Sequence, residues 1–361
     1  MININDNTVA VETSAELKSV LEANNDITLI YLAKDITLAQ GISILETKKQ
    51  ITIDGLYPTD GTGTIHTYTD MNSASSADTI GVRRASSINI TVQNLNVIGK
   101  NYYGLIYVAE GTSYQNVVVT YKNITYNGPQ ITYHPSGLSI YQDLIINIID
   151  STACVANEVA EAGSLQIGGK TIITHNSAGN STFWFRGYTT TPFLEILENA
   201  NVSITTSRDI AYTSRYLKIA VNKNAVFNIK SKYGFFRDNG HQASEILVDE
   251  NSSFTVIQGQ TNSSYATKQK SKRFWGKLAY FFYGIKQLFT IKDFRIRLID
   301  SDGNVTSGKY IMIIIANSRS VAGFKINKNA CLQDGSADVV LIKRKNSFLN
   351  YLTSLFTMAK L

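Results

Sequence analysis

The stretch ENANVSI at residues 198–204 recurs as KNAVFNI at 223–229 and again as ENSSFTV at 250–256. The distance from Ile204 to Ile229 is 25 residues, and the distance from Ile229 to Val256 is 27. A period of roughly 20 to 30 residues, built only from short strands and turns, is typical of a solenoid of stacked coils. One coil alone cannot bury its inward stripe, so stacking supplies the stability. The repeat therefore predicts a β-solenoid.

The same alternation of apolar and polar residues extends far towards the N-terminus, interrupted by Asn, Gly, Ser and Asp turns. It is seen at Ile27, Leu29 and Tyr31, at Ile51 and Ile53, at Ile88, Ile90, Val92, Leu95 and Val97, and at Val117, Val119 and Tyr121. We predict a mainly β chain that forms a right-handed parallel β-helix. An antiparallel sandwich is the alternative, because strand spacing does not report whether strands pair in parallel.

One helix is expected at residues 13–22. It opens with Thr13, Ser14, Ala15 and Glu16, the pattern of a capping box, in which the hydroxyl accepts from first-turn amides and the Glu side chain reaches back. We expect this helix to cover the open first coil of the solenoid.

Composition narrows the function classes. Only 17% of the 361 residues are charged and 4 are Pro, which excludes a disordered tail, a coiled coil and a collagen-like repeat. The densest apolar stretch, 311–316, is too short to cross a bilayer as a helix. Two cysteines exclude a disulfide framework. Residues 1–7 contain no secretory signal, so we expect either a cytoplasmic protein or one whose true beginning is missing.

Charge divides the chain in two. Residues 1–266 hold 17 Lys plus Arg against 23 Asp plus Glu, a net −6, whereas residues 267–361 hold 17 against 5, a net +12. The polar stretch from Gln258 to Ser264 lies at this change. We therefore predict two domains, a solenoid at 1–260 and a basic α+β segment at 266–361. The basic segment suggests contact with anionic lipid, and no nucleic-acid partner is expected.

The first domain resembles a known family. Residues Ile51 to Gly55, Ser87 to Val97, Tyr103 to Tyr107 and Val117 to Pro129 resemble the pectate-lyase-like adhesive domains of Gram-positive surface proteins, over about residues 10–260. The resemblance implies a β-helical stalk or binding module at the cell surface, with a carbohydrate or host-surface ligand.

Tyrosines are the candidate ligand-binding residues of this domain. Tyrosine combines a flat apolar face with a polar tip, which suits stacking against sugars or a protein contact. The candidates are Tyr103, Tyr107, Tyr126 and Tyr133. The alternative is that these rings only stack along the coils.

A polysaccharide lyase or hydrolase is a further alternative for a β-helix. Such enzymes need clustered carboxylates, with Ca²⁺ and a base or as an acid and base pair. Asp143 and Asp150 are seven residues apart around apolar positions and are interpreted as strand flanks. The four His residues occur singly, without metal-ligand spacing.

The last segment combines helical and strand patterns. Trp275, Leu278, Phe282, Ile285 and Phe289 follow a helical spacing. Strands are predicted at 294–300, 310–316 and 339–343, with a turn at Asp302 and Gly303, and a second helix at 348–361.

This segment resembles the β-rich second domain of bacterial diacylglycerol and related lipid kinases, over about residues 266–350. The resemblance rests on residues 276–281 and 284–286, on Ala316, Asn317 and Ser318, on Gly323 and Phe324, and on residues 332–339, which include Gly335. It implies that Asp334 and Asp338 hold a structural divalent cation, with Mg²⁺ at Asp334. Gln333 and Ala322 depart from the family pattern, where a second acidic residue and a Gly are usual.

Two features of a working lipid kinase are missing from this sequence. It contains no GGDG loop, whose glycines let backbone amides approach ATP phosphates, and no later catalytic acid motif before Leu361. Gly168, Gly169 and Lys170 are interpreted as a hairpin-type turn. We expect no kinase activity, because phosphoryl transfer depends on positioning the phosphates.

Three functions follow from these patterns. The first is a non-catalytic, adhesin-like β-helix fused to a truncated kinase domain. The second is a lipid-kinase relative at the membrane, inactive without an ATP-binding domain, and the third is a polysaccharide-active enzyme. The first would place the chain at the cell surface if a signal was lost, the second in the cytoplasm or at a membrane.

Overall fold

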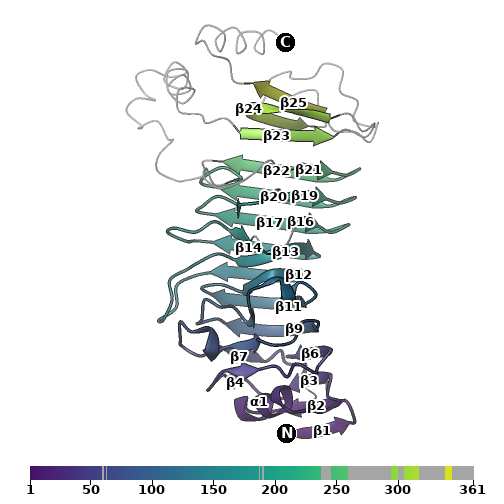
Figure 1. The fold of residues 1–361 in the computed structure, drawn as a ribbon, viewed down its shortest axis with the longest axis vertical. Coiled ribbons are helices and arrows are strands. Elements are labelled where there is room, and N and C mark those ends of the chain that lie inside the picture. Colours follow the sequence, from purple (N-terminus) through teal and green to yellow (C-terminus); the bar gives the residue numbers. More distant parts are fainter. Residues whose placement is uncertain are drawn as a thin grey trace.

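The computed structural model shows a stack of β-coils that rises from the N-terminus to β21 and β22 (Glu245–Val248 and Ser253–Gln258) (Figure 1). It describes residues 1–58, 61, 63–186, 188, 191–236, 245–258, 294–299, 305–316 and 338–343.

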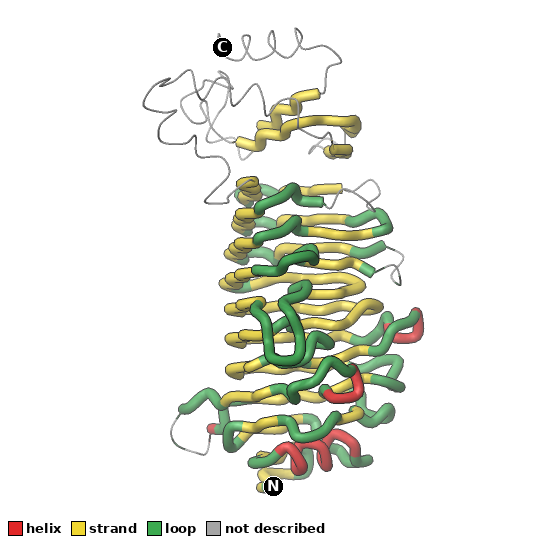
Figure 2. The backbone as a smooth tube through the Cα atoms, turned by 90° about the vertical axis from the view of Figure 1, so that its left-hand side faces the viewer, coloured by secondary structure: helices red, strands yellow, loops and turns green. Residues whose placement is uncertain are grey.

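The strands of the solenoid lie in three columns, one on each side of the stack (Figures 1 and 2). The first column holds β5 (Ile42–Ser43), β8 (Ile80–Val82), β10 (Ile106–Val108), the starts of β12 (Thr132–Ile148) and β13 (Ala160–Gly168), β15 (Phe183–Phe185) and β18 (Ala211–Thr213). The second holds β2 (Thr8–Val11), β3 (Leu29–Leu32), β6 (Gln50–Asp54), the first halves of β9 (Asn89–Ile98) and β11 (Val118–Gly128), the middle of β12, the end of β13, β16 (Phe193–Ile196), β19 (Lys218–Val221) and β21. The third holds β4 (Ile36–Thr37), β7 (Thr67–Thr69), the ends of β9, β11 and β12, β14 (Lys170–His175), β17 (Asn201–Thr206), β20 (Val226–Ser231) and β22.

Neighbouring coils pair in parallel throughout these columns. Ile90 of β9, for example, lies opposite Ile51 of β6 on one side and Val119 of β11 on the other. The prediction of a parallel β-helix is therefore confirmed, and the antiparallel sandwich is wrong for the solenoid. Sequence-distant residues become neighbours in such a stack, so each coil places its side chains directly over those of the coil below.

The core consists of inward-facing side chains stacked in rows. One row runs Ile53, Val92, Tyr121, Tyr141, Ile167, Ile196 and Val221, all buried. At about 25 cal/mol per Å² of apolar surface removed from water, such rows supply the stability that a single coil lacks.

The corner between the second and third columns explains the repeat. In its three copies the second residue, Asn199, Asn224 or Asn251, has a positive φ of 60°, 59° or 55°. Asn tolerates this left-handed conformation because its short side chain bonds locally. Asn224 Nδ2 donates to Asn199 Oδ1 at 3.0 Å, so the corner amides also bond between coils. The following Ala225 is buried inside the turn.

Gly169 occupies the same corner one coil below Asn199, with φ at 57°. It joins β13 to β14, which lie in different parallel columns, so the predicted hairpin-type turn is wrong. A Cβ here would lie 2.2 Å from Asp143 Oδ1, the atom that accepts from the Lys170 N–H. Glycine is therefore required by both the φ angle and this close approach.

The N-terminal end is closed by α1 (Ser14–Glu22), as predicted for 13–22. Thr13 Oγ1 accepts from Glu16 N–H, and Glu16 Oε2 accepts from Glu12 N–H at 2.7 Å, which is the capping-box pattern moved back by one residue. Leu17 and Leu21 are fully buried against the first coils. An additional strand that the sequence did not indicate, β1 (Ile2–Asn5), pairs antiparallel with β2.

Three strands follow the solenoid. They are β23 (Phe294–Ile299), β24 (Val305–Ala316) and β25 (Asp338–Lys343), which pair antiparallel in this order. Glu245 of β21 lies opposite Arg297 of β23 in a parallel pairing. Strands were predicted in all three places, although β24 begins five residues earlier than expected. The two predicted helices and the turn at Asp302 lie outside the described residues.

Candidate functional site

A ladder of outward side chains runs along the first column, and we call this surface the ladder face. Strand pairing places the middle residues of successive three-residue segments directly over one another. These residues are Tyr107, Tyr133, Glu161, Trp184 and Tyr212. Four aromatic rings and one carboxylate therefore follow the long axis of the solenoid.

Alternation explains why these side chains point outwards. In β15 the flanking Phe183 and Phe185 are buried, and in β13 the flanking Ala160 and Ala162 are buried. Successive residues of a strand face opposite sides, so a buried residue on each side directs the middle one away from the core.

One end of the ladder face is a tyrosine cluster. The Tyr107 and Tyr133 rings stack at 5.4 Å between centroids, and Tyr103 packs edge-on against both, at 5.5 and 4.9 Å. Tyr102 lies 4.1 Å from Tyr103. Edge-to-face and offset contacts at these distances hold the rings rigidly. The Tyr102, Tyr103 and Tyr107 rings stay partly exposed, whereas Tyr133 is only 6% exposed.

The other end is a shallow hollow of about 340 Å³, lined by Trp184, Arg186, Tyr188, Tyr212 and Ser214. The Arg186 guanidinium carbon lies 4.2 Å from the centroid of the Trp184 ring. The centroid of the Tyr212 ring lies 5.7 Å from the centroid of the Trp184 ring. A cation over an indole face fixes the orientation of both groups.

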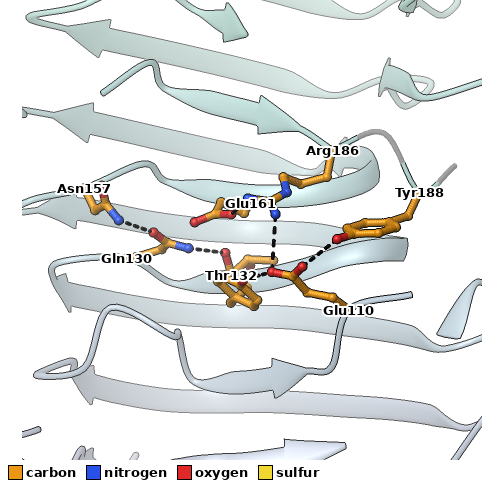
Figure 3. Close-up of polar contacts among 8 residues, drawn as sticks. Glu110, Gln130, Thr132, Asn157, Glu161, Arg186 and Tyr188 are labelled. Carbon is orange, nitrogen blue, oxygen red and sulfur yellow. Dashed lines mark hydrogen bonds and ion pairs between the residues drawn. The ribbon is translucent and has the colours of Figure 1, made fainter. Parts of the chain in front are cut away.

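Arg186 joins the two ends through a pair of carboxylates (Figure 3). Its Nη1 contacts Glu161 Oε2 at 3.0 Å, and its Nη2 contacts Glu110 Oε1 at 3.3 Å. Glu110 also accepts from the Tyr188 hydroxyl at 2.6 Å and from the Tyr133 hydroxyl. These bonds tie the segments after β10 and β15 together across two intervening coils.

The two carboxylates differ in proton affinity. Burial raises the pKa of Glu161, which is only 3% exposed, to about 7, against the opposing effect of Arg186. The pKa of Glu110 is lowered, because the Tyr133 and Tyr188 hydroxyls and Arg186 outweigh its partial burial. Glu110 therefore stays ionised at neutral pH, while Glu161 takes up a proton near neutral pH.

Buried amides support the start of β12 behind the ladder face (Figure 3). Gln130 Nε2 donates to the Thr132 carbonyl at 2.9 Å, and Asn157 Nδ2 donates to Gln130 Oε1 at 3.0 Å. From the core side, the Tyr141 hydroxyl donates to Thr132 Oγ1 at 2.7 Å. Such satisfied buried networks hold the backbone of the site in one place.

Three of the four predicted tyrosines meet on this face. Tyr103, Tyr107 and Tyr133 belong to the tyrosine cluster, whereas Tyr126 is a fully buried core residue whose hydroxyl bonds to Gln130, so no ligand reaches it. Asn317, Gly323, Phe324, Asp334 and Gly335 lie outside the described residues. Asp338 begins β25, and its side chain is likewise not described.

The remaining ladder residues were not singled out from the sequence. Glu110, Glu161, Trp184 and Arg186 come from four separate segments and meet only through coil stacking. A signal existed in the triplets IYV at 106–108, FWF at 183–185 and AYT at 211–213, each with an aromatic between smaller or buried neighbours. Glu161 in AEA at 160–162 carries the same pattern without the aromatic.

The histidines within the described ranges take no part in this face. Burial lowers the pKa of His134 to about 3 and that of His175 to about 4, so both are neutral core residues. His175 Nε2 lies 2.7 Å from the Asn157 carbonyl and Nδ1 lies 2.8 Å from Thr206 Oγ1. Among the described side chains, no group of three or more His, Cys, Asp or Glu is placed to hold a metal ion. The described part also contains no helix with the length and apolarity that a membrane crossing needs.

The chain forms a parallel β-helix, and part of it is similar to known proteins. Residues 8–133 match the family described as "putative pectate lyase-like adhesive domain". This confirms the first resemblance over its N-terminal part, while the coils themselves continue to β22. A solved structure titled L. reuteri 53608 SRRP is 17% identical with a TM-score of 0.47, covering 69% of this chain and 99% of that chain.

The second resemblance is also confirmed. A stretch of 87 residues is 32% identical to a diacylglycerol kinase of Staphylococcus carnosus strain TM300, covering 24% of this chain and 28% of that kinase. A diacylglycerol kinase of Staphylococcus aureus strain JH9 is 33% identical over 87 residues, which cover 24% of this chain and 27% of that kinase. The chain thus spans less than a third of the length of these curated relatives.

Proposed function

We propose that the solenoid, residues 1–260, is a non-catalytic binding module of an adhesin and that the ladder face binds a carbohydrate at a cell or host surface. The observation that carries this proposal is the axial ladder of Tyr107, Tyr133, Trp184 and Tyr212 interrupted by Glu161. Aromatic faces stack on the apolar faces of sugar rings, and the polar groups between them bond to hydroxyls.

Spacing favours an extended glycan that follows the long axis. Adjacent ladder residues are one coil apart, about 4.8 Å, so the partly exposed rings of Tyr107 and Trp184, three coils apart, are separated by about 14 Å, which is close to the length of three sugar rings. Two aromatic platforms separated by a polar gap therefore suit an oligosaccharide that stacks at both ends of this gap.

A binding role is favoured over cleavage by the state of the carboxylates. Glu161 is buried beneath Arg186, and Glu110 is saturated by Arg186, Tyr133 and Tyr188. A general acid must reach the glycosidic oxygen of the substrate. The pair serves instead to hold Arg186 and Tyr188 in position.

The first test is a binding screen with the full chain. We expect retardation in gels that contain a soluble polysaccharide, and an affinity for its oligosaccharides that rises with length up to about four rings, the span of the ladder at the coil spacing. The proposal is wrong if no surface glycan of host or bacterial origin retards the chain, or if monosaccharides bind as tightly as oligosaccharides.

We further propose that the basic segment at 266–361 is a separate domain that contacts anionic lipid and that Asp334 and Asp338 bind a structural Mg²⁺. The 87-residue similarity to diacylglycerol kinases and the charge of this segment support the proposal. Each basic residue close to an anionic membrane contributes about 1 kcal/mol.

Vesicle flotation tests this second role. We expect the full chain to float with phosphatidylglycerol vesicles at low salt and not with phosphatidylcholine vesicles. Replacing Lys268, Lys270, Lys272 and Arg273 by Gln should weaken this binding at least tenfold, while the same change at the exposed solenoid residues Lys49, Lys122, Lys218 and Lys230 should leave it unchanged. An equal loss of vesicle binding in both variants would contradict the proposal, because it would mean that the net charge of the whole chain, and not the basic segment, determines binding.

A further inference from the structure

A lysine and an asparagine meet at the N-terminal end of the solenoid, away from the ladder face. Lys48, in the turn between β5 and β6, is only 6% exposed. Its Nζ lies 2.7 Å from Asn25 Oδ1 and 3.2 Å from the Asn25 carbonyl oxygen, just beyond the end of α1. The Asn25 Cγ is one bond from Oδ1, so the amine lies within reach of an electrophilic carbon.

The Asn25 side chain is held by two further bonds. Its Oδ1 accepts from the Ile27 N–H at 3.1 Å, and its Nδ2 donates to the Val20 carbonyl at 3.1 Å. The Ile27 N–H on Oδ1 polarises the side-chain carbonyl, in the manner of a donor that stabilises an oxyanion. The Val20 contact orients the NH₂ group that would have to leave.

The lysine is also disposed to lose its proton. Burial lowers the pKa of Lys48, against the opposing attraction of the Asp26 carboxylate. A buried amine is a nucleophile only in its neutral form, and the lowered pKa increases the fraction of Lys48 in that form.

We propose that Lys48 and Asn25 form an intramolecular isopeptide bond. Neutral Nζ attacks the Asn25 Cγ, the new C–N bond forms, and the bond from Cγ to Nδ2 breaks. Nδ2 leaves as ammonia and takes up the proton that Nζ loses. No oxidant, reductant or further reactant is consumed.

The bond would close a ring over residues 25–48 and lock α1 onto the first coils. A cross-link stabilises chiefly by restricting the unfolded chain, as a disulfide does. It would secure the end of the stack, where a solenoid coil has a neighbour on one side only.

Mass spectrometry of the purified full chain tests the proposal. We expect an intact mass about 17 Da below that of the sequence, the loss of one ammonia. We also expect a tryptic product in which peptide 19–34 is joined to peptide 35–49, because trypsin does not cleave after an acylated Lys48. Lys48→Arg should restore the full mass and separate the peptides, while the exposed neighbour variant Lys49→Arg should retain the joined product.

Two results would overturn the proposal. The first is a full intact mass in the unmodified chain, which would leave a hydrogen-bonded lysine only. The second is a loss of ammonia that persists in Lys48→Arg, which would indicate cyclisation of an asparagine onto its own backbone. The first result is read on the unmodified wild-type chain, so it does not depend on whether Lys48→Arg folds as stably.

Discussion

Replacing Asp70 by Asn should stabilise the solenoid by about 4 kcal/mol above pH 8 and have little effect near pH 4. Asp70 is 1% exposed, and its Oδ2 accepts only a long bond from the Lys100 N–H, at 3.4 Å. Burial raises the pKa of this carboxyl from 3.8 to about 7. That difference corresponds to about 4 kcal/mol, at roughly 1.4 kcal/mol for each tenfold change in proton affinity.

The sign follows from linkage. A raised folded-state pKa means that, between pH 3.8 and about 7, the folded chain keeps a proton which the unfolded chain has released. The stability that the protonated Asp70 gives the folded chain is therefore fully present below pH 3.8 and is lost as pH rises through about 7. Asn remains neutral and keeps the shape of the protonated acid. Urea unfolding of both chains at pH 4, 6 and 8 measures the difference.

The matched control is Asp6→Asn, which removes an exposed carboxylate and should leave the free energy of unfolding nearly unchanged at each pH. A constant difference between Asp70→Asn and the wild type from pH 4 to pH 8 would contradict the account, because it would mean that Asp70 does not titrate in the folded state.

Replacing Arg186 by Ala should destabilise the solenoid by about 3 to 5 kcal/mol at pH 8, the cost of leaving a buried charge without its partner. Glu161 is the charge concerned, since Arg186 is the cation that the structure places 3.0 Å from it. At pH 5 the cost should be smaller, because Glu161, with a pKa of about 7, is then protonated.

A second substitution separates the charge from the lost packing. Adding Glu161→Gln to Arg186→Ala should recover most of the loss at pH 8, since the glutamine needs no counter-charge. Thermal unfolding of the wild type, both single variants and the double variant at pH 5 and 8 gives this cycle. A loss that is equal at both pH values, or that Glu161→Gln fails to recover, would show that Arg186 acts through its contact with Trp184 instead.

The fold of the solenoid was largely predictable because its determinants are local. The copies at 198, 223 and 250 place Asn at a corner that requires a positive φ, and each following strand alternates with period two. The same local signal placed α1, whose capping box requires only four consecutive residues. The β1 strand was missed because Ile2 and Ile4 are exposed and their pairing with β2 depends on the chain end folding back.

The site was predictable only in part, because it is assembled across coils. Tyr103, Tyr107 and Tyr133 were selected by chemistry alone, and Tyr126 carries the same chemistry in the core. Whether a tyrosine faces in or out depends on its position relative to the corner, which requires the register of the coil. Glu110 and Arg186 are 76 residues apart in sequence, and no local pattern connects them.

The kinase-like segment differs from the solenoid, because its motif is recognisable in the sequence while the site proposed for it lies outside the described residues. Its motif at 332–339 is recognisable in sequence, and its strands β23, β24 and β25 were placed correctly. The proposed roles of Asp334 and Asp338 depend on the resemblance, since their side chains lie outside the described part.

The central claim is that the ladder face binds a glycan, and calorimetric titration of Trp184→Ala tests it most directly. With the oligosaccharide found in the screen, this variant should bind about tenfold more weakly than the wild type, the loss of one stacking platform worth roughly 1.5 kcal/mol. Tyr233→Ala removes an exposed tyrosine outside the ladder face and should bind as the wild type does. Unchanged binding by Trp184→Ala and also by Tyr107→Ala, with the fold intact by circular dichroism, would contradict the claim.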